Sequence, residues 1–79
     1  MKTEGKWIKF VLQKQKSKTQ VWDIIAKQEN LPLGYIAWFP RWRCYAFFPN
    51  NNMVFETDCL KNIIDFISEL EAKRKENKT

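Results

Sequence analysis

The hydrophobic pattern in the first half of the chain has the two-residue period of β-strands. Apolar and polar side chains alternate along residues 7–13 and again along residues 19–27. This alternation, in segments rich in β-branched and aromatic residues, predicts two strands. The polar segment 15–18 between them is typical of a hairpin loop. The first strand is predicted to carry Ile8, Phe10 and Leu12 on one face and Trp7, Lys9, Val11 and Gln13 on the other. The second is predicted to carry Trp22, Ile24 and Ala26 on one face and Val21, Asp23 and Ile25 on the other.

A second pair of strands is predicted at residues 33–39 and 42–48. If Pro40 and Arg41 alone form the turn between them, Phe39 lies opposite Trp42, and the other cross-strand pairs follow by counting. One face then carries Gly34, Ile36, Trp38, Arg43, Tyr45 and Phe47. The other face carries Leu33, Tyr35, Ala37, Phe39, Trp42, Cys44, Ala46 and Phe48. Pro40 departs from the Asn-Gly signal of the tightest hairpins, so a shift of one residue, which would exchange the two faces, is an alternative.

Beyond the asparagine-rich turn at 50–52 the period changes to that of an amphipathic helix. Thr57 or Asp58 is the predicted N-cap. The expected buried stripe consists of Leu60, Ile63, Ile64, Ile67 and Leu70, with Cys59 and Phe66 at its margins. The residues expected to face water are Lys61, Asn62, Asp65, Ser68 and Glu69.

Together these elements predict an α+β fold in the order ββββα. An antiparallel sheet of three to four strands carries one C-terminal helix on one face. A chain of 79 residues allows a single domain, so residues 1–79 are assigned to one domain, with residues 1–5 and 73–79 as loosely ordered ends.

The second pair of strands is apolar on both faces, and a single helix cannot bury both. We expect the helix to cover the bulkier face, which holds Ile36, Trp38, Tyr45 and Phe47, with Gly34 leaving room for its close approach. The opposite face then exposes aromatic rings around small residues, and exposed apolar patches of this size mark partner surfaces. The predicted partner-binding residues are Tyr35, Phe39, Arg41, Trp42, Arg43 and Phe48.

The net charge of +5 is unevenly distributed along the chain. Residues 1–18 hold six lysines against one glutamate, whereas residues 19–70 are slightly acidic. A basic excess favours polyanions, although scattered surface charge also serves solubility alone. Arginines among aromatic rings can bind phosphates, anchor a protein interface or simply cover a tryptophan. The alternative site, for nucleic acid, consists of Lys9, Lys14, Lys16, Lys18, Arg41 and Arg43.

The residue types present argue against enzymatic catalysis and against a bound metal or cofactor. There is no histidine, which removes the commonest general base and metal ligand. Cys44 and Cys59 form no CxxC pair and are expected as reduced, small hydrophobic residues. Two glycines cannot form a phosphate-binding loop. We therefore predict a protein that is not an enzyme and uses neither metal nor cofactor. No apolar run or secretory signal suggests a membrane, and a cytoplasmic protein is expected.

Between residues 34 and 70 the chain carries a recognisable series of aromatic and turn residues: Trp38, Trp42-Arg43, Tyr45, Phe47-Phe48-Pro49, Phe55 and Cys59-Leu60. This series resembles a family of short, uncharacterised phage and prophage proteins. The resemblance implies an origin in a phage or mobile element and a role inside a bacterial host cell. In fold alone, a sheet packed on a helix is similar to integrase arm-binding domains, which read DNA with the sheet.

The hypothesis that combines these features is a phage accessory protein that binds a host protein and inhibits host defence or regulation. A nucleic-acid-binding protein is the alternative, and a structural homodimer is the third. Salt dependence separates the first two, because phosphate contacts weaken steeply with salt.

Overall fold

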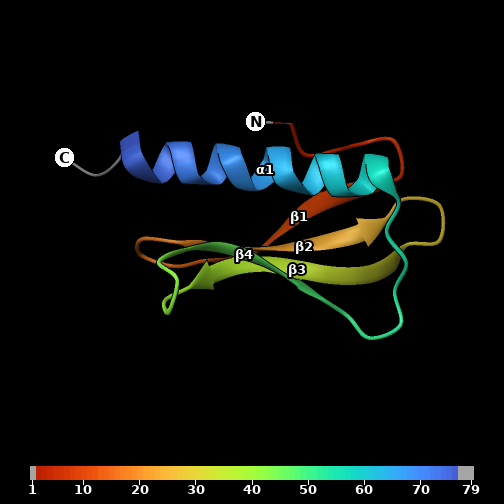
Figure 1. Cartoon of the computed structure of the whole chain (residues 1–79), viewed down its shortest axis with the longest axis horizontal. Helices are drawn as coiled ribbons and strands as arrows, with labels where there is room; N and C mark the ends of the chain where they lie inside the picture. The colour runs from red at the N-terminus through yellow and green to blue at the C-terminus, as the bar shows by residue number, and fades with distance from the viewer. Residues whose placement is uncertain (1, 77–79) are drawn as a thin grey trace.

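The computed structural model describes residues 2–76. Its elements are β1 (Ile8–Gln15), β2 (Gln20–Ala26), β3 (Leu31–Phe39), β4 (Cys44–Pro49) and α1 (Thr57–Glu76). The strands form one antiparallel sheet in the order β1-β2-β3-β4, and α1 lies across one face of it (Figure 1). The predicted α+β class and the ββββα order are confirmed.

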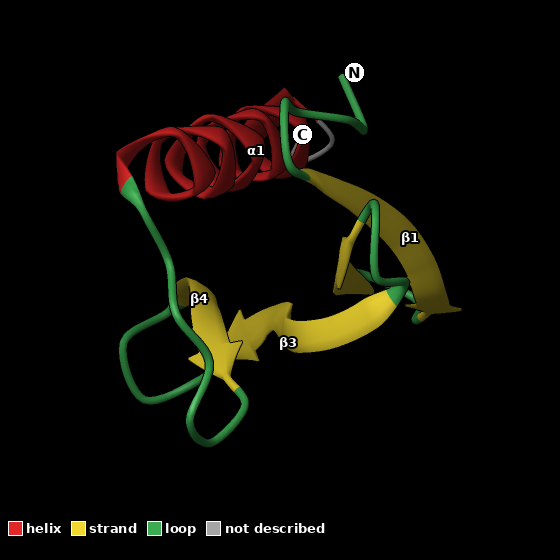
Figure 2. Cartoon of the chain, turned by 90° about the vertical axis from the view of Figure 1, so that its right-hand side faces the viewer, coloured by secondary structure: helices red, strands yellow, loops and turns green. Residues whose placement is uncertain are grey.

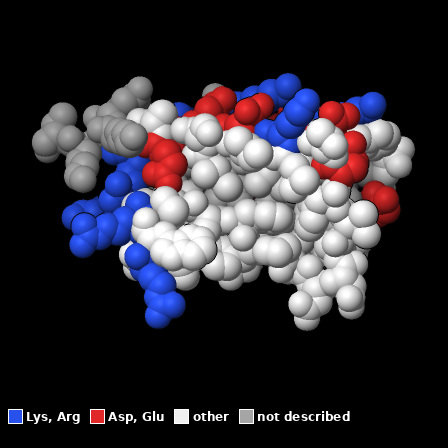
Figure 3. All heavy atoms as spheres, in the orientation of Figure 1, with Lys and Arg blue, Asp and Glu red and all other residues white. Residues whose placement is uncertain are grey.

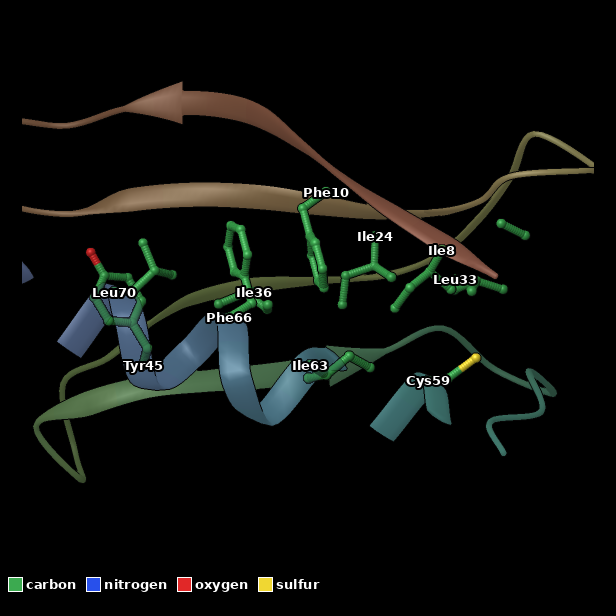
Figure 4. Close-up of a cluster of buried hydrophobic side chains, with 11 residues drawn as sticks. Ile8, Phe10, Ile24, Leu33, Ile36, Tyr45, Cys59, Ile63, Phe66 and Leu70 are labelled. Carbon is green, nitrogen blue, oxygen red and sulfur yellow. The ribbon is translucent and has the colours of Figure 1, made fainter. Parts of the chain in front are cut away.

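The sheet curls around the helix, and the core fills the space between them (Figure 2). Phe66 of α1 is the centre of this core, because its ring stacks on Phe10 at 4.1 Å and meets Trp22 edge-on at 4.9 Å. The buried cluster drawn in Figure 4 consists of Ile8, Phe10, Ile24, Ala26, Leu33, Ile36, Tyr45, Cys59, Ile63, Phe66 and Leu70. Trp38 and Phe47 pack against this cluster, so the face predicted to lie beneath the helix does so.

The buried stripe of α1 differs from the predicted one. Cys59, Ile63, Phe66 and Leu70 are buried, whereas Ile64 is 61% exposed and Leu60 is 44% exposed. The placement of Leu60 and Ile64 in the core was therefore wrong. Both stripes have helical spacing, so the period alone does not choose between them. The choice falls to the stripe that contains Phe66, whose ring fills the space beside Phe10.

The N-cap of α1 lies one residue before the first predicted candidate, and the helix begins at Thr57. The Glu56 carboxylate accepts a hydrogen bond of 2.6 Å from the backbone N–H of Cys59, as an N-cap side chain does, so Glu56 rather than Thr57 or Asp58 is the cap. This hydrogen bond holds the pKa of Glu56 below its ordinary value.

The N-terminal segment is hydrogen-bonded to the sheet, although residues 1–5 were expected to be loose. Thr3 accepts a bond from Phe10 N–H, and Glu4 forms an isolated bridge with Lys9. The ammonium of Lys27 contacts the Glu4 carboxylate at 3.0 Å. At the other end, α1 continues to Glu76 through part of the expected loose tail. Residue 1 and residues 77–79 lie outside the described part.

The turn between β3 and β4 has four residues, 40–43, instead of the predicted two. The N–H of Trp42 donates to the carbonyl of Phe39, and the N–H of Arg43 donates to the carbonyl of Pro40. Arg43 has a left-handed φ of 54°. Pro40 suits the second position of a type I turn, which here begins at Phe39. Phe39 consequently pairs with Cys44, not with Trp42. The predicted register was wrong by two residues, and because the side-chain period is two, the faces of the strands were still right.

One further face assignment needs correction. The register of β2 and β3 shifts between Ile24 and Ile25, and Leu33, predicted for the outer face, is buried in the core. Leu12 shares a predicted face with the buried Ile8 and Phe10 but is exposed, because β1 turns away from α1 along its length (Figure 1).

The reason for glycine at position 34 also differs from the prediction. A Cβ atom there would lie 2.5 Å from the backbone oxygen of Phe48 and 2.9 Å from Cα of Pro49. Gly34 therefore allows β4, and not the helix, to come close.

Candidate partner-binding face

Four aromatic side chains form a continuous row on the face of the sheet that points away from α1. Tyr35 and Phe48 are paired across β3 and β4, and their rings stack with centroids 4.8 Å apart. Phe48 meets Phe39 edge-on at 6.1 Å, and Phe39 meets Trp42 edge-on at 5.0 Å. We call these four residues the aromatic row. The structure thus brings together the four aromatic residues predicted as partner anchors.

Exposure is greatest at the two ends of the row. Phe39 and Phe48 are half-buried, Tyr35 is 39% exposed and Trp42 is 70% exposed. Ala37 and Ala46 pair directly opposite each other between the aromatic residues. Because these two side chains are small, the neighbouring aromatic rings protrude from the sheet surface. The row therefore offers a partner a raised apolar surface.

The two hairpin turns lie at the same end of the sheet and carry four cations (Figure 1). Lys16 and Lys18 lie on the β1–β2 turn, and Arg41 and Arg43 lie on the β3–β4 turn; all four are exposed. We call these four residues the basic end. In Figure 3 blue side chains gather at this end, and much of the visible sheet side is uncharged. Trp42 therefore lies where the aromatic row meets the basic end.

The remaining basic residues of the alternative site are not all at this end. Lys14 is exposed near the end of β1, close to the turn in sequence. Lys9 is half-buried near the start of β1. Its backbone pairs with Ile25 of β2 on one side and forms the isolated β-bridge with Glu4 on the other. The structure therefore groups Lys14 with the basic end and leaves Lys9 apart from it.

Two helix residues missed by the sequence analysis hold the aromatic hairpin from its inner side. The guanidinium of Arg74 lies 4.0 Å above the Trp38 ring, and the Glu71 carboxylate accepts a 2.6 Å hydrogen bond from Tyr45 N–H. Their spacing of three residues places both on one flank of the helix, which was the available signal. The sequence analysis considered Arg41 or Arg43 as the arginine that covers a tryptophan. In the described part of the chain, the arginine that stacks on a tryptophan is Arg74, on Trp38.

The outer face of the sheet is convex, because the sheet curls toward α1 (Figure 2). Within residues 2–76, α1 covers the inner face and no helix covers the outer one. A convex surface with raised rings is suited to entering a hollow on another molecule.

The two cysteines lie on different elements, Cys44 on β4 and Cys59 on α1. Cys44 is half-buried and Cys59 is buried, both as free thiols, and burial raises the pKa of Cys59. In the same residues no group of acidic and cysteine side chains could hold a metal ion. The helix that the structure describes is too polar to cross a lipid bilayer.

The chain belongs to a family of short phage proteins. The relative that shows this is the "Uncharacterized 9.3 kDa protein" of Acholeplasma phage L2, which is 36% identical over 59 residues. The aligned part spans 75% of this chain and 76% of the relative. No family model matches the chain. No solved structure matches it either, so the expected likeness to integrase arm-binding domains has no support.

Proposed function

We propose that this chain is a non-enzymatic phage accessory protein that binds a protein of the bacterial host through its aromatic row. The observation that carries the proposal is a row of four packed aromatic residues, two exposed and two half-buried, on a sheet face that α1 does not cover. Large apolar groups on a monomer surface are costly to keep in water, and they dominate binding energy when a partner buries them. Inhibition of host defence or regulation is the role that such binding would serve.

The packing of the rings favours a protein partner over nucleotide bases. Tyr35 and Phe48 each use one ring face against the other, at an interplanar angle of 14°. Bases bind by stacking on free ring faces. Beside these packed rings the row offers one largely exposed ring, that of Trp42, and a protruding aromatic side chain of this kind fits an apolar protein pocket.

The test is affinity capture from nuclease-treated host lysate with the wild-type chain, Trp42→Ala and Ile64→Ala as baits. Ile64 is the matched control, because it is also an exposed apolar residue but lies on the helix. We expect a host protein to be retained by the wild type and by Ile64→Ala and lost from Trp42→Ala. Equal retention by Trp42→Ala contradicts the proposal.

A second candidate, nucleic-acid binding, is favoured by the basic end beside Trp42. In that case the cations would contact phosphates while Trp42 stacks on a base. Retention of single-stranded and double-stranded DNA at about 50 mM salt tests it, since phosphate contacts are strong at low salt. Replacing Lys14, Lys16 and Lys18 by alanine should then abolish retention while the fold persists. Absence of retention by the wild type excludes this candidate.

The third candidate, a structural homodimer, would bury the aromatic row against a second copy. Sedimentation of the wild type and Trp42→Ala over a range of concentrations tests it. A dimer that is lost in Trp42→Ala supports this candidate over the first.

A further inference from the structure

We infer that the host partner presents an apolar hollow bordered by carboxylates. The aromatic row enters the hollow, and the basic end contacts the acidic border. This inference rests on the proposed function and specifies the chemistry of the partner.

The first argument is the charge beside the row. Four cations lie on the two turns at this end, and the described residues of those turns contain no acidic side chain. The ion pair found among residues 2–76 joins Lys27 to Glu4, away from the basic end. Arg41 and Arg43 therefore meet no carboxylate of the described chain. A partner that supplies carboxylates here gains charge complementarity, which speeds encounter and disfavours wrong partners.

The second argument is the type of cation closest to the row. Arg41 and Arg43 flank Trp42 in sequence, and Trp42 is the most exposed ring of the row. A guanidinium donates two parallel hydrogen bonds to one carboxylate and tolerates partial burial better than an ammonium. An arginine on either side of an anchoring tryptophan thus matches a pocket whose border carries aspartate or glutamate.

The third argument is shape. The outer face is convex (Figure 2), so two copies packed through it would touch over a limited area, whereas a stable interface buries roughly 800 Å² on each partner. A hollow on a different protein encloses the row and excludes water from the ring edges. The surface is therefore better suited to another protein than to a second copy.

The experiment selects peptides from a random 16-residue library displayed on filamentous phage, with the immobilised wild-type chain as the bait. Binding of the enriched peptides is then compared for the wild type, Trp42→Ala, the double variant Arg41→Ala/Arg43→Ala, and the control Lys2→Ala/Lys61→Ala. The control removes the same charge from exposed positions outside the basic end.

We expect enriched peptides to combine bulky apolar residues with aspartate or glutamate in excess of the starting library. Their affinity should fall at least about tenfold in Trp42→Ala and about tenfold in the arginine double variant, and by less than about twofold in the control. Higher salt should weaken binding to the wild type more than to the arginine double variant, which lacks the two charges.

Peptides that depend on Trp42 but lack an acidic excess, or that bind the arginine double variant as well as the control, overturn this inference and leave the proposed function standing. Peptides that bind regardless of Trp42 overturn both. Tighter binding of a 20-nucleotide single strand than of any peptide, or a wild-type dimer that Trp42→Ala abolishes, assigns the face to nucleic acid or to a second copy and also overturns both.

Discussion

The carboxylate of Glu71 accepts a hydrogen bond of 2.6 Å from the backbone N–H of Tyr45. One turn further along α1, Arg74 covers the Trp38 ring. Both contacts join the helix to the β3–β4 hairpin, whose opposite face carries the aromatic row. The helix therefore supports the binding face from behind, and its last turns matter for that face although they are distant from it in sequence.

Glu71→Ala should lower the free energy of unfolding by about 1.5–2 kcal/mol, because it leaves the part-buried N–H of Tyr45 without an acceptor. Glu71→Gln keeps an acceptor and should lose less. Chemical denaturation measures both. Glu69→Ala, which removes an exposed carboxylate from the same helix, is the control and should change stability by less than about 0.5 kcal/mol. An equal effect of the two alanine variants would show that the Tyr45 contact contributes nothing.

Ile63→Ala and Ile64→Ala form a matched pair that tests the helix phase. Ile63 is 3% exposed and Ile64 is 61% exposed. Removing the buried side chain should cost about 2–4 kcal/mol through lost burial and a cavity, whereas Ile64→Ala should cost less than about 1 kcal/mol. Denaturant unfolding of the two variants decides the phase, and a similarly large loss in both would restore the stripe predicted from the sequence, which held both residues.

Trp38 and Trp42 should respond oppositely to truncation. Trp38 packs against the core beneath Arg74, so Trp38→Ala should cost about 2–4 kcal/mol and lower the melting temperature markedly. Trp42→Ala should stay within about 1 kcal/mol of the wild type and lose at least about 2 kcal/mol of partner affinity. Thermal melting together with partner retention measures both. Unfolding of Trp42→Ala would mean that its ring is a structural element and not an anchor.

The Glu56 cap predicts a pH dependence of stability. Its pKa is lowered in the folded state by the hydrogen bond from Cys59 N–H, so the unfolded state binds the proton more tightly. The cap therefore stabilises the fold above the ordinary glutamate pKa, and this effect is lost as the pH falls below that value and through the lowered folded-state pKa. Glu56→Gln should flatten the stability profile in that range. Glu29→Gln removes another exposed carboxylate and should leave the profile steeper than Glu56→Gln does.

The sequence predicted the strands, the helix and the two faces, because each depends on a local period. It did not predict the register of β3 and β4, which depends on how Pro40 shapes the turn. The sequence also did not predict which side of the helix faces the sheet. Two adjacent apolar stripes have the same spacing, and the contact of the Phe66 ring with Phe10 selects one of them. The contacts of Glu71 and Arg74 join residues 26 and 36 positions apart. Their three-residue spacing indicates a shared flank of the helix but does not identify their partners on the strands.

The aromatic residues of the candidate site were predicted correctly as neighbours for a simple reason. An error of two residues in register moves every cross-strand partner but leaves each side chain on its face. The gathering of Lys16 and Lys18 with Arg41 and Arg43 follows from the antiparallel order, in which alternate turns share an end of the sheet. Lys9 was included only because it belongs to the same basic stretch of sequence.

The Tyr45 hydrogen bond has a further consequence for how the molecule can associate. An open sheet edge with free N–H groups recruits further strands, from a partner or from other copies, and can propagate into fibres. On β4, Glu71 occupies the Tyr45 donor and Pro49 has no N–H to offer. On β1, the carbonyl of Thr3 accepts the N–H of Phe10, and Lys14 places a charge near the end of the strand. Assembly by added strands is thus discouraged at both edges, and complexes of this chain should have a small, fixed stoichiometry.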